Sequence, residues 1–377
     1  MSLNAVWLTM NPNLGASARS LQDWILLGRN ADLDISVVLR SDGDLKRWLA
    51  GEQVPYMLDP MAWPGWSTLL ANAAHAWTVR RWAGKQGAQV IHCYEHDLYP
   101  FAVVLRAITS LPLVCHIHFA PDRQFMAWAF GGRLKKPDAV VWTSQQQQAD
   151  CRAAVDGLVP QERQHVIPLG LDLRRFGSDV AARENLRHRL GIAPEAIVVG
   201  AANAFRARKR VDDFLQLVRA VRDNHPNVVG LLAGGEVPGD EEYAREIAPR
   251  IRSLEDGGRF HWLGNLEPIE PFMHATDIFV STSEYETFGM SVLEAMACEN
   301  AVVAYRGGSV HEVVGKAGLI VETGDQPGLV AAVQTVVENA ELRKQISTAA
   351  KQRVHEQYNA HTSLDSIKEL YRSISGR

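Results

Sequence analysis

The chain has 377 residues, of which 46% are hydrophobic and 22% are charged, and its formal net charge is −4. This length exceeds the roughly 250 to 300 residues at which a single hydrophobic core usually divides, so two domains are expected. The balanced charge excludes a basic nucleic acid-binding surface as the main feature, and no apolar run approaches the roughly 20 residues that span a bilayer.

Strand-like and helix-like segments alternate along the chain, which predicts parallel sheets covered by helices. Strands are expected at residues 5–9 and 35–39, on either side of a helix at 17–27. The turn-rich loop 11–15 follows the first strand, at the edge where doubly wound sheets bind ligands. The N-terminus has no basic segment before a long apolar core, so it reads as a first strand and not as a signal peptide.

The next stretch is rich in tryptophan, and the Pro64-Gly65 break separates a loop from a helix expected to begin near Ser67. The tryptophans are Trp48, Trp63, Trp66, Trp77 and Trp82. The simplest interpretation is that they pack on the face of a half-buried helix. Because Arg80, Arg81 and Lys85 lie close by, an acceptor pocket or a weak peripheral membrane association is the alternative.

Two predicted strands, 88–93 and 113–118, carry histidines and cysteines. The six potential zinc ligands are His92, Cys93, His96, Cys115, His116 and His118. None has the local spacing of a known metal site, so core histidines and thiols are the expected interpretation and no metal is predicted. The 4 cysteines are scattered without CxxC spacing, which indicates reduced thiols and a cytoplasmic protein.

A domain boundary is expected near Gly170, because Pro168 and Gly170 make a rigid turning linker. After a strand at 197–201, four cations follow within five residues, ahead of a helix that starts at 211: Arg206, Arg208, Lys209 and Arg210. Cations at a strand-to-helix turn suit an anion. The alternative is a solvated basic turn that is partly balanced by Asp212 and Asp213.

Glycines mark the end of the next strand in this half of the chain. Gly234 and Gly235 follow a strand at 228–233, and such a turn lets a ligand or another segment approach the backbone closely. No G-x-G-x-x-G follows any strand, which disfavours a nicotinamide-dinucleotide enzyme.

Two carboxylates flank a strand-to-helix junction at 277–297. Gly289 marks the expected helix start, where unpaired N–H groups and the helix dipole favour a phosphate. Glu286 precedes this anion site, and Glu294 lies roughly 7 to 8 Å further along the helix axis. A nucleotide-sugar has a matching layout of sugar, diphosphate and ribose. Alternatively, Glu286 only stabilises the helix dipole, and Glu294 is an ordinary solvated helix residue. The apolar residues around Glu294 disfavour solvation, and a buried Glu294 needs a ligand hydroxyl or a protein donor as its partner.

These motifs resemble the retaining nucleotide-sugar glycosyltransferases of family 4, also called group 1. The resemblance rests on S-x-x-E-x-x-G-x-x-x-L-E-A-M-A-C, on the segment 165–176 and on the Arg206-x-x-Lys209 loop, and it covers nearly the whole chain. It implies a GT-B fold, an α/β architecture of two Rossmann-like domains facing across a cleft. The expected acceptor-side domain is 1–170 plus 358–377, because the last helix of the family crosses back, and the donor-side domain is 171–357.

The resemblance also implies residue roles. Glu286 would contact the transferred sugar near the reacting carbon, Glu294 the ribose, and His118 a sugar hydroxyl. Arg206 and Lys209 would hold the diphosphate. The remaining implied donor contacts are Gly15, Gly234, Gly264, Asn265, Phe288, Gly289 and Met290. The chain departs from the family pattern at Ala16, where a second glycine is usual, and at Leu169, where asparagine is usual.

The implied activity is transfer of a hexose from a nucleoside-diphosphate sugar, with UDP as the first expected base and GDP as the second. The acceptor would be a glycan, a lipid-linked molecule or a small molecule, and the reaction would retain anomeric configuration without a metal or other cofactor. A nucleotide-sugar epimerase and a non-catalytic nucleotide-sugar-binding protein of the same fold are the alternatives. The expected location is the cytoplasm or the inner face of its membrane.

Overall fold

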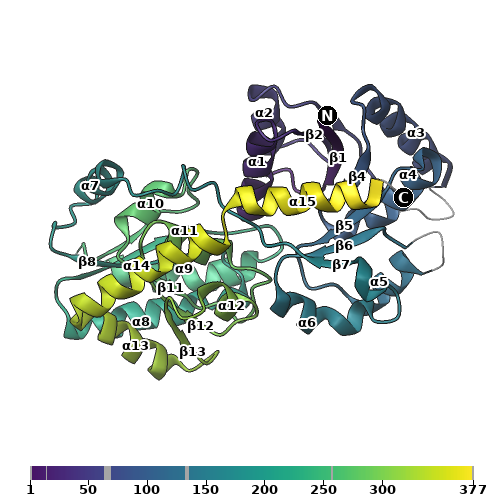
Figure 1. The fold of residues 1–377 in the computed structure, drawn as a ribbon. Coiled ribbons are helices and arrows are strands. Elements are labelled where there is room, and N and C mark those ends of the chain that lie inside the picture. The colour runs from purple at the N-terminus through teal and green to yellow at the C-terminus, as the bar shows by residue number, and fades with distance from the viewer. Residues whose placement is uncertain (1, 14, 63–68, 132–135, 256–257, 376–377) are drawn as a thin grey trace. The chain divides into compact units, whose positions relative to one another are not determined.

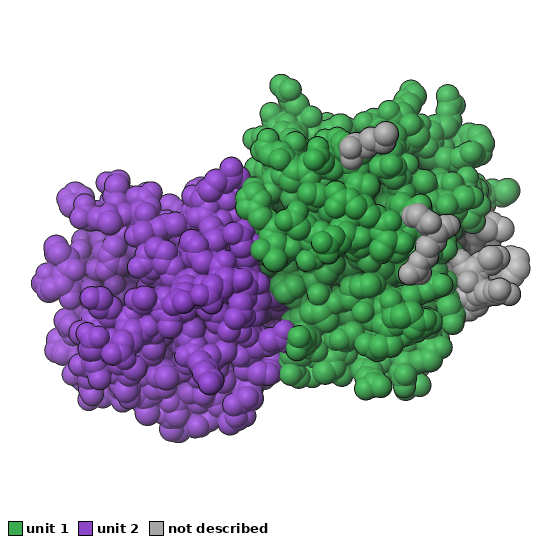
Figure 2. All heavy atoms as spheres, in the orientation of Figure 1, with its two compact units in different colours: residues 1–170, 360–377 green, residues 171–359 purple. Residues whose placement is uncertain are grey.

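The structure is a computed structural model that describes residues 2–13, 15–62, 69–131, 136–255 and 258–375. Its contacts divide the chain into unit 1, Met1–Gly170 with Ala360–Arg377, and unit 2, Leu171–Asn359 (Figure 2). The sequence-based division had put residues 358 and 359 in the first domain. In the structure they group with unit 2, where the Leu171 N–H donates to the Tyr358 carbonyl at 2.9 Å.

Unit 1 is built on one parallel sheet of seven strands in the order β3-β2-β1-β4-β5-β6-β7 (Figure 1). The strands are β1 (Leu3–Thr9), β2 (Leu33–Leu39), β3 (Tyr56–Leu58), β4 (Val90–Cys93), β5 (Leu113–Ile117), β6 (Ala139–Trp142) and β7 (Gln164–Val166). The central strands β4, β5 and β6 are buried at every residue. This burial explains their nearly continuous apolar sequences, since helices cover both faces of a parallel sheet.

Most helices of unit 1 connect consecutive strands of this sheet, and the last helix of the chain also belongs to this unit. They are α1 (Ala16–Gly28), α2 (Asp44–Gly51), α3 (Leu69–Lys85), α4 (Tyr99–Thr109), α5 (Arg123–Phe130), α6 (Gln145–Val155) and α15 (Ala360–Ser375), with short 3₁₀ turns η1 (His96–Leu98) and η3 (Gln161–Arg163). Helix α15 lies beside α1 (Figure 1). The helix start expected near Ser67 and the side chains of Trp63 and Trp66 fall outside the described residues.

Unit 2 has a second parallel sheet, of six strands in the order β10-β9-β8-β11-β12-β13. The strands are β8 (Ile197–Ala202), β9 (Val228–Ala233), β10 (Phe260–Trp262), β11 (Ile278–Ser281), β12 (Ala301–Tyr305) and β13 (Leu319–Val321). The helices are α7 (Val180–Arg189), α8 (Val211–Asn224), α9 (Glu241–Glu255), α10 (Glu270–Ala275), α11 (Met290–Ala297), α12 (Val310–Val314), α13 (Gln326–Glu338) and α14 (Ala340–Gln357), with one 3₁₀ turn, η4 (Ala207–Lys209).

The predicted α/β class with two doubly wound parallel sheets is therefore confirmed. In each sheet the strand order reverses at one place, between β1 and β4 in unit 1 and between β8 and β11 in unit 2. Loops that leave the two strands of such a switch point diverge and open a crevice at the carboxyl edge. These two edges are where functional side chains are expected to gather.

Candidate functional site

The switch point of unit 2 brings together two loops that the sequence had singled out separately. Strands β8 and β11 are parallel neighbours, with Val199 opposite Ile278, so loops 203–210 and 282–289 leave the same edge. The Glu284 N–H donates to the Arg208 carbonyl at 2.8 Å, and the Thr282 hydroxyl donates to the Lys209 carbonyl at 2.7 Å. The cationic loop and the Glu286 loop thus form one continuous structure.

Within it, the Lys209 ammonium forms an ion pair with Glu286 Oε1, and the two side chains are only 15% and 13% exposed. The Ser283 hydroxyl donates to the same oxygen at 2.7 Å. Burial opposes ionisation of this carboxyl, but Lys209, Ser283 and Arg208 together hold the pKa of Glu286 below its usual value. Glu286 is consequently a carboxylate at neutral pH, with limited contact with water.

The backbone of Glu286 is held by the turn that follows β12. The Ser309 N–H donates to the Glu286 carbonyl at 2.8 Å. Gly308 has a φ of +57°, and a Cβ there would lie 2.3 Å from that carbonyl oxygen, so a larger residue would push the loop away. This close approach fixes the carboxylate relative to the start of α11.

Helix α11 starts as predicted, with Gly289 before its first residue at a φ of 96° and no side-chain cap. Phe288 and Met290 flank this glycine and are buried, with the Phe288 ring packed edge-on against Tyr358. Glu294 has no exposed surface, so it is not the solvated helix residue of one sequence alternative. The structure thus places Glu286 in the loop at the carboxyl edge of the sheet and keeps Glu294 fully buried.

Further along the same edge, the ends of β8, β9 and β10 approach each other through glycine. The Gly234 N–H donates to the Gly264 carbonyl at 2.7 Å, and a Cβ on Gly234, whose φ is 107°, would lie 1.9 Å from the Asn203 carbonyl oxygen. Arg206 points to the loop after β9, with Nε 3.3 Å from Asp240 Oδ2, and its side chain is 41% exposed. Arg206 and Lys209 therefore share a loop but have different partners here.

Asn265 lies on the same edge, where a Cβ added to Gly235 would be 3.4 Å from its side-chain oxygen. In unit 1, Gly15 precedes α1 with an extended φ of −166°, and its carbonyl accepts from the Arg19 N–H at 2.8 Å. Because any residue adopts that conformation and nothing lies within 4 Å of an added Cβ, the backbone does not require glycine there.

The switch point of unit 1 carries a buried acid that the sequence analysis missed. Glu95 follows β4 and is 1% exposed; Thr9 Oγ1 donates to its Oε1 at 2.9 Å and the Met10 N–H to its Oε2 at 3.2 Å. Burial raises the pKa of Glu95 to about 8. The sequence does show an acidic residue two positions after a buried strand. We did not select it as a candidate because the neighbouring histidines are more conspicuous.

This raised pKa predicts how stability depends on pH. The unfolded carboxyl loses its proton near pH 4.3, whereas the folded one keeps it to about pH 8, so stability should fall as the pH rises between these values. We expect the melting temperature of the wild type to drop by about 5 °C or more from pH 5 to pH 8. In Glu95→Gln the drop should be smaller, whereas the exposed control Glu162→Gln should match the wild type. An equal drop in Glu95→Gln would contradict the assignment.

His118 directly follows β5, and its ring lies 4.2 Å from those of Tyr94 and His116, centroid to centroid. Burial, helped by His96, lowers the pKa of His118 to about 3, so the imidazole is neutral at pH 7. Its role toward a sugar hydroxyl remains a proposal. It lies in a different unit from Glu286.

The other histidines of the zinc alternative are core residues. His92 and His116 hydrogen-bond each other at 3.3 Å, and the second ring nitrogen of His92 meets the Tyr371 hydroxyl of α15 at 2.6 Å. Burial holds the pKa of both rings well below the usual value. Cys93 and Cys115 are buried free thiols. Across the described part of the chain, no group of three or more His, Cys, Asp or Glu side chains is arranged to hold a metal.

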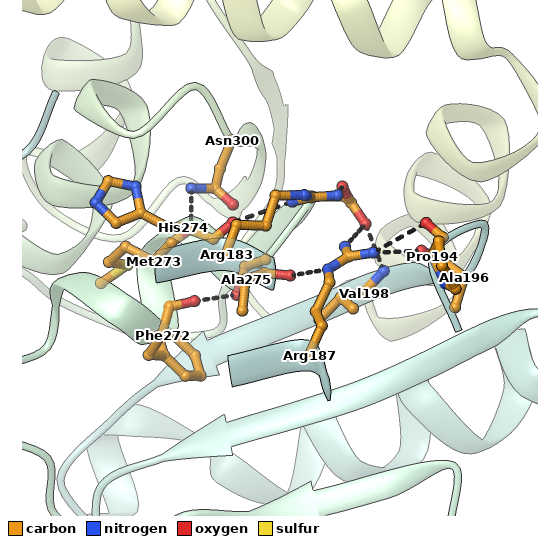
Figure 3. Close-up of polar contacts among 12 residues, drawn as sticks. Arg183, Arg187, Pro194, Ala196, Val198, Phe272, Met273, His274, Ala275 and Asn300 are labelled. Atoms are coloured by element: carbon orange, nitrogen blue, oxygen red, sulfur yellow. Dashed lines mark hydrogen bonds and ion pairs between the residues drawn. The ribbon is translucent and has the colours of Figure 1, made fainter. Parts of the chain in front are cut away.

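A pocket of about 400 Å³ lies at the opposite end of β11, lined in part by Arg183, His274 and Asp277. Arg187 donates to the Ala275 and Ala196 carbonyls, and Arg183 to that of His274, which ties the helices here to the sheet (Figure 3). Asp277 immediately precedes β11, whereas Glu286 follows the other end of this strand. The pocket and Glu286 therefore lie at opposite ends of β11. We interpret the pocket as structural.

Family models match both halves of the chain. Residues 15–170 match the Glycosyl transferase 4-like domain, and residues 182–353 match Glycosyl transferases group 1. The alpha-maltose-1-phosphate synthase of Mycolicibacterium smegmatis is 27% identical over 266 residues, 67% of each protein. The lipopolysaccharide core biosynthesis mannosyltransferase LpcC of Rhizobium leguminosarum is 23% identical over 290 residues, 76% of this chain and 79% of that protein.

Among solved structures, Anabaena HepE in complex with UDP and glucose superposes with a TM-score of 0.83 and 23% identity, covering 98% of this chain and 100% of that one. At that identity the likeness establishes the fold. Together with the two family models, which leave few residues unmatched, it gives a plain conclusion: the chain belongs to the group 1 glycosyltransferases and has the GT-B fold.

Proposed function

We propose that the chain transfers a hexose from a nucleoside-diphosphate sugar to an acceptor hydroxyl, with retention of anomeric configuration and without a metal ion. The observation that carries this proposal is the Lys209–Glu286 pair beside the start of α11, where Gly289 provides no side-chain cap, at the switch point of unit 2. A cation, a helix N-terminus and a carboxylate at one edge of the sheet suit a diphosphate joined to a sugar.

In this reaction the bond between the anomeric carbon and the diphosphate oxygen breaks, and the acceptor oxygen bonds to that carbon on the same face. The acceptor's proton passes to the departing phosphate. Lys209, Arg206 and the N–H groups at the start of α11 would stabilise the charge that grows on the leaving diphosphate. Glu286 would position the sugar and stabilise the positive charge on its ring.

UDP remains our first expected base and GDP our second. The fold relative HepE was solved with UDP and glucose, and the sequence relative LpcC is named a mannosyltransferase, which supports a hexose donor. Gly264 and Asn265 at the end of β10 are proposed to contact the base, and Gly234 the nucleotide. Glu294 is proposed to bind the ribose, which would require its surroundings to open, since its side chain is fully buried here.

Substitution of Lys209 by Met should weaken binding of the nucleoside diphosphate by about 10-fold or more, since a charge-assisted hydrogen bond contributes roughly 1.5 to 3 kcal/mol. The same change should raise the pKa of Glu286, because burial would then act with less opposition, and should move the acid limb of the pH–rate profile upward. Calorimetric titration and kcat/KM against pH measure both effects. Lys351→Met is the matched control, because Lys351 pairs with Glu299 at the surface.

A thermal-shift panel with UDP, GDP, ADP and NAD, each with and without EDTA, tests the donor site. A ligand at one hundred times its Kd should stabilise the protein by about 2.7 kcal/mol. We expect one nucleoside diphosphate to give a shift that EDTA leaves unchanged. A shift with NAD alone, or none with any diphosphate, would overturn the proposal. Product analysis with the matching sugar nucleotide then separates a transferase from an epimerase and from a non-catalytic binder.

A further inference from the structure

Helix α3 of unit 1 exposes a face whose chemistry the transferase reaction does not use. Trp77 is 51% exposed and Leu70 is 86% exposed, and in the same unit Leu58 on the edge strand β3 is 41% exposed. The helix holds Arg80, Arg81 and Lys85 and no acidic residue along Leu69–Lys85. Exposed large apolar side chains and only positive charge thus occur together on this helix, although the net charge of the protein is −4.

These side chains share one face of the helix. Leu70, Trp77, Arg81 and Lys85 stand at spacings of seven, four and four residues, which keeps them in one row along a helix. Arg80 bends over the same face, with its guanidinium carbon 4.6 Å from the centre of the Trp77 ring. We call this row the α3 face.

An apolar groove runs between the α3 face and β3. It has a volume of about 350 Å³, and its lining combines apolar and aromatic side chains with two cations: Tyr56, Met57, Trp77, Trp82, Arg81 and Lys85. Apolar surface therefore lies directly beside cations. Among the residues that the structure describes, Arg81 and Lys85 have no ion-pair partner, so their charge is available to an anion outside the protein.

The groove lies along the edge strand β3, whose Tyr56 and Met57 pair in register with Val37 and Val38 of β2. The α3 helix runs back from the carboxyl edge of the sheet to the start of β4, and just after the helix the Gln89 N–H donates to the carbonyl of Asn4 near the start of β1 at 2.8 Å. Arg81 and Lys85 are therefore on the half of α3 nearer the amino ends of the strands, and Trp77 stands at the middle of the helix. Glu95 follows β4, which is three strands away from β3 in the sheet, so the groove and Glu95 are separate sites.

We propose that the α3 face docks the chain on an anionic lipid surface. Tryptophan suits the headgroup boundary because its ring is apolar and its N–H is polar, and Arg and Lys stems bury in that region while their charges meet lipid phosphates. The described residues include no helix long and apolar enough to cross a membrane, so attachment through this part of the chain would be peripheral.

Co-sedimentation of the full chain with vesicles tests this. We expect binding to vesicles of phosphatidylcholine with 30% phosphatidylglycerol, little binding to phosphatidylcholine alone, and release in 0.5 M NaCl. Each positive charge near an anionic surface contributes about 1 kcal/mol, which is about a fivefold change in affinity. Arg81→Gln with Lys85→Gln should therefore weaken binding about 20- to 30-fold. Trp77→Ser should weaken it further.

The matched controls are Trp128→Ser, a tryptophan 42% exposed on α5, and Arg189→Gln with Arg245→Gln in unit 2. Both controls should bind vesicles like the wild type, and all variants should keep the nucleotide-induced thermal shift, which separates this proposal from the proposed function. The proposal would be overturned if the chain bound both vesicle types equally or did not bind at all. It would also be overturned if the control variants lost as much vesicle binding as the α3 variants. A dimer in light scattering that Trp77→Ser abolishes would overturn it as well, since the face would then join two copies of the chain.

Discussion

Glu286→Gln should lower kcat by about 10²- to 10³-fold while the nucleoside diphosphate still binds. Glutamine keeps the size of the side chain and can still accept from Ser283, but it carries no charge to stabilise a positive sugar ring. The loss should appear in kcat rather than in KM for the donor, because the charge matters most in the transition state. Steady-state kinetics with the matching nucleotide-sugar, together with calorimetric binding, measure both quantities.

Glu284→Gln is the control for this experiment. Glu284 lies in the same loop, two residues earlier, but its side chain is 49% exposed and pairs with Arg210 at the surface. Its substitution should change kcat by less than about threefold, since exposed ion pairs contribute roughly 0 to 1 kcal/mol. Near-normal turnover of Glu286→Gln would rule out both a nucleophilic and a positioning role for Glu286.

The largest expected effect on stability is at Asp277, which holds two arginines at the amino end of β11. Its carboxylate accepts from Arg183 at 2.6 Å, from Arg187 at 2.5 Å and from the Val198 N–H at 2.7 Å. The Arg187 side chain is only 5% exposed. Asp277→Asn would leave that buried guanidinium without its counter-charge and should lower the free energy of unfolding by about 3 to 5 kcal/mol.

Urea unfolding measures this loss, and hydrogen exchange in β8 and β11 assigns it to unit 2. Arg183→Gln is the matched control, because Arg183 pairs with the same carboxylate but is 33% exposed. It should cost about 1 kcal/mol or less. Similar losses in the two variants would show that burial of Arg187 does not decide the effect.

The two sheets could be predicted because parallel strands buried on both faces leave continuous apolar runs, as in β5 and β12. The start of α11 could also be predicted, since a glycine stands directly before a run of strong helix formers. By contrast, β3 has three residues that are half-buried or exposed, and it escaped prediction because so short and mixed a segment carries no periodic signal.

The Lys209–Glu286 contact could not be predicted from spacing. The two residues are 77 positions apart, and they meet only because β8 and β11 are neighbours at the reversal of strand order. Local sequence indicates that each residue follows a strand, but not which strands are adjacent. Glu95 was missed for the same reason, since its partners Thr9 and Met10 stand 86 and 85 positions away in the chain. Ser283 is only three residues from Glu286, but the sequence does not show that its hydroxyl turns toward that carboxylate.

The reaction itself is tested most directly by an NMR time course with the nucleotide-sugar chosen by the thermal-shift panel, in EDTA, with and without candidate sugar acceptors. From an α-linked donor we predict release of the nucleoside diphosphate and an α-linked product, both strongly reduced in Glu286→Gln. An inverted product, or equal release by Glu286→Gln, would contradict the proposed site and mechanism.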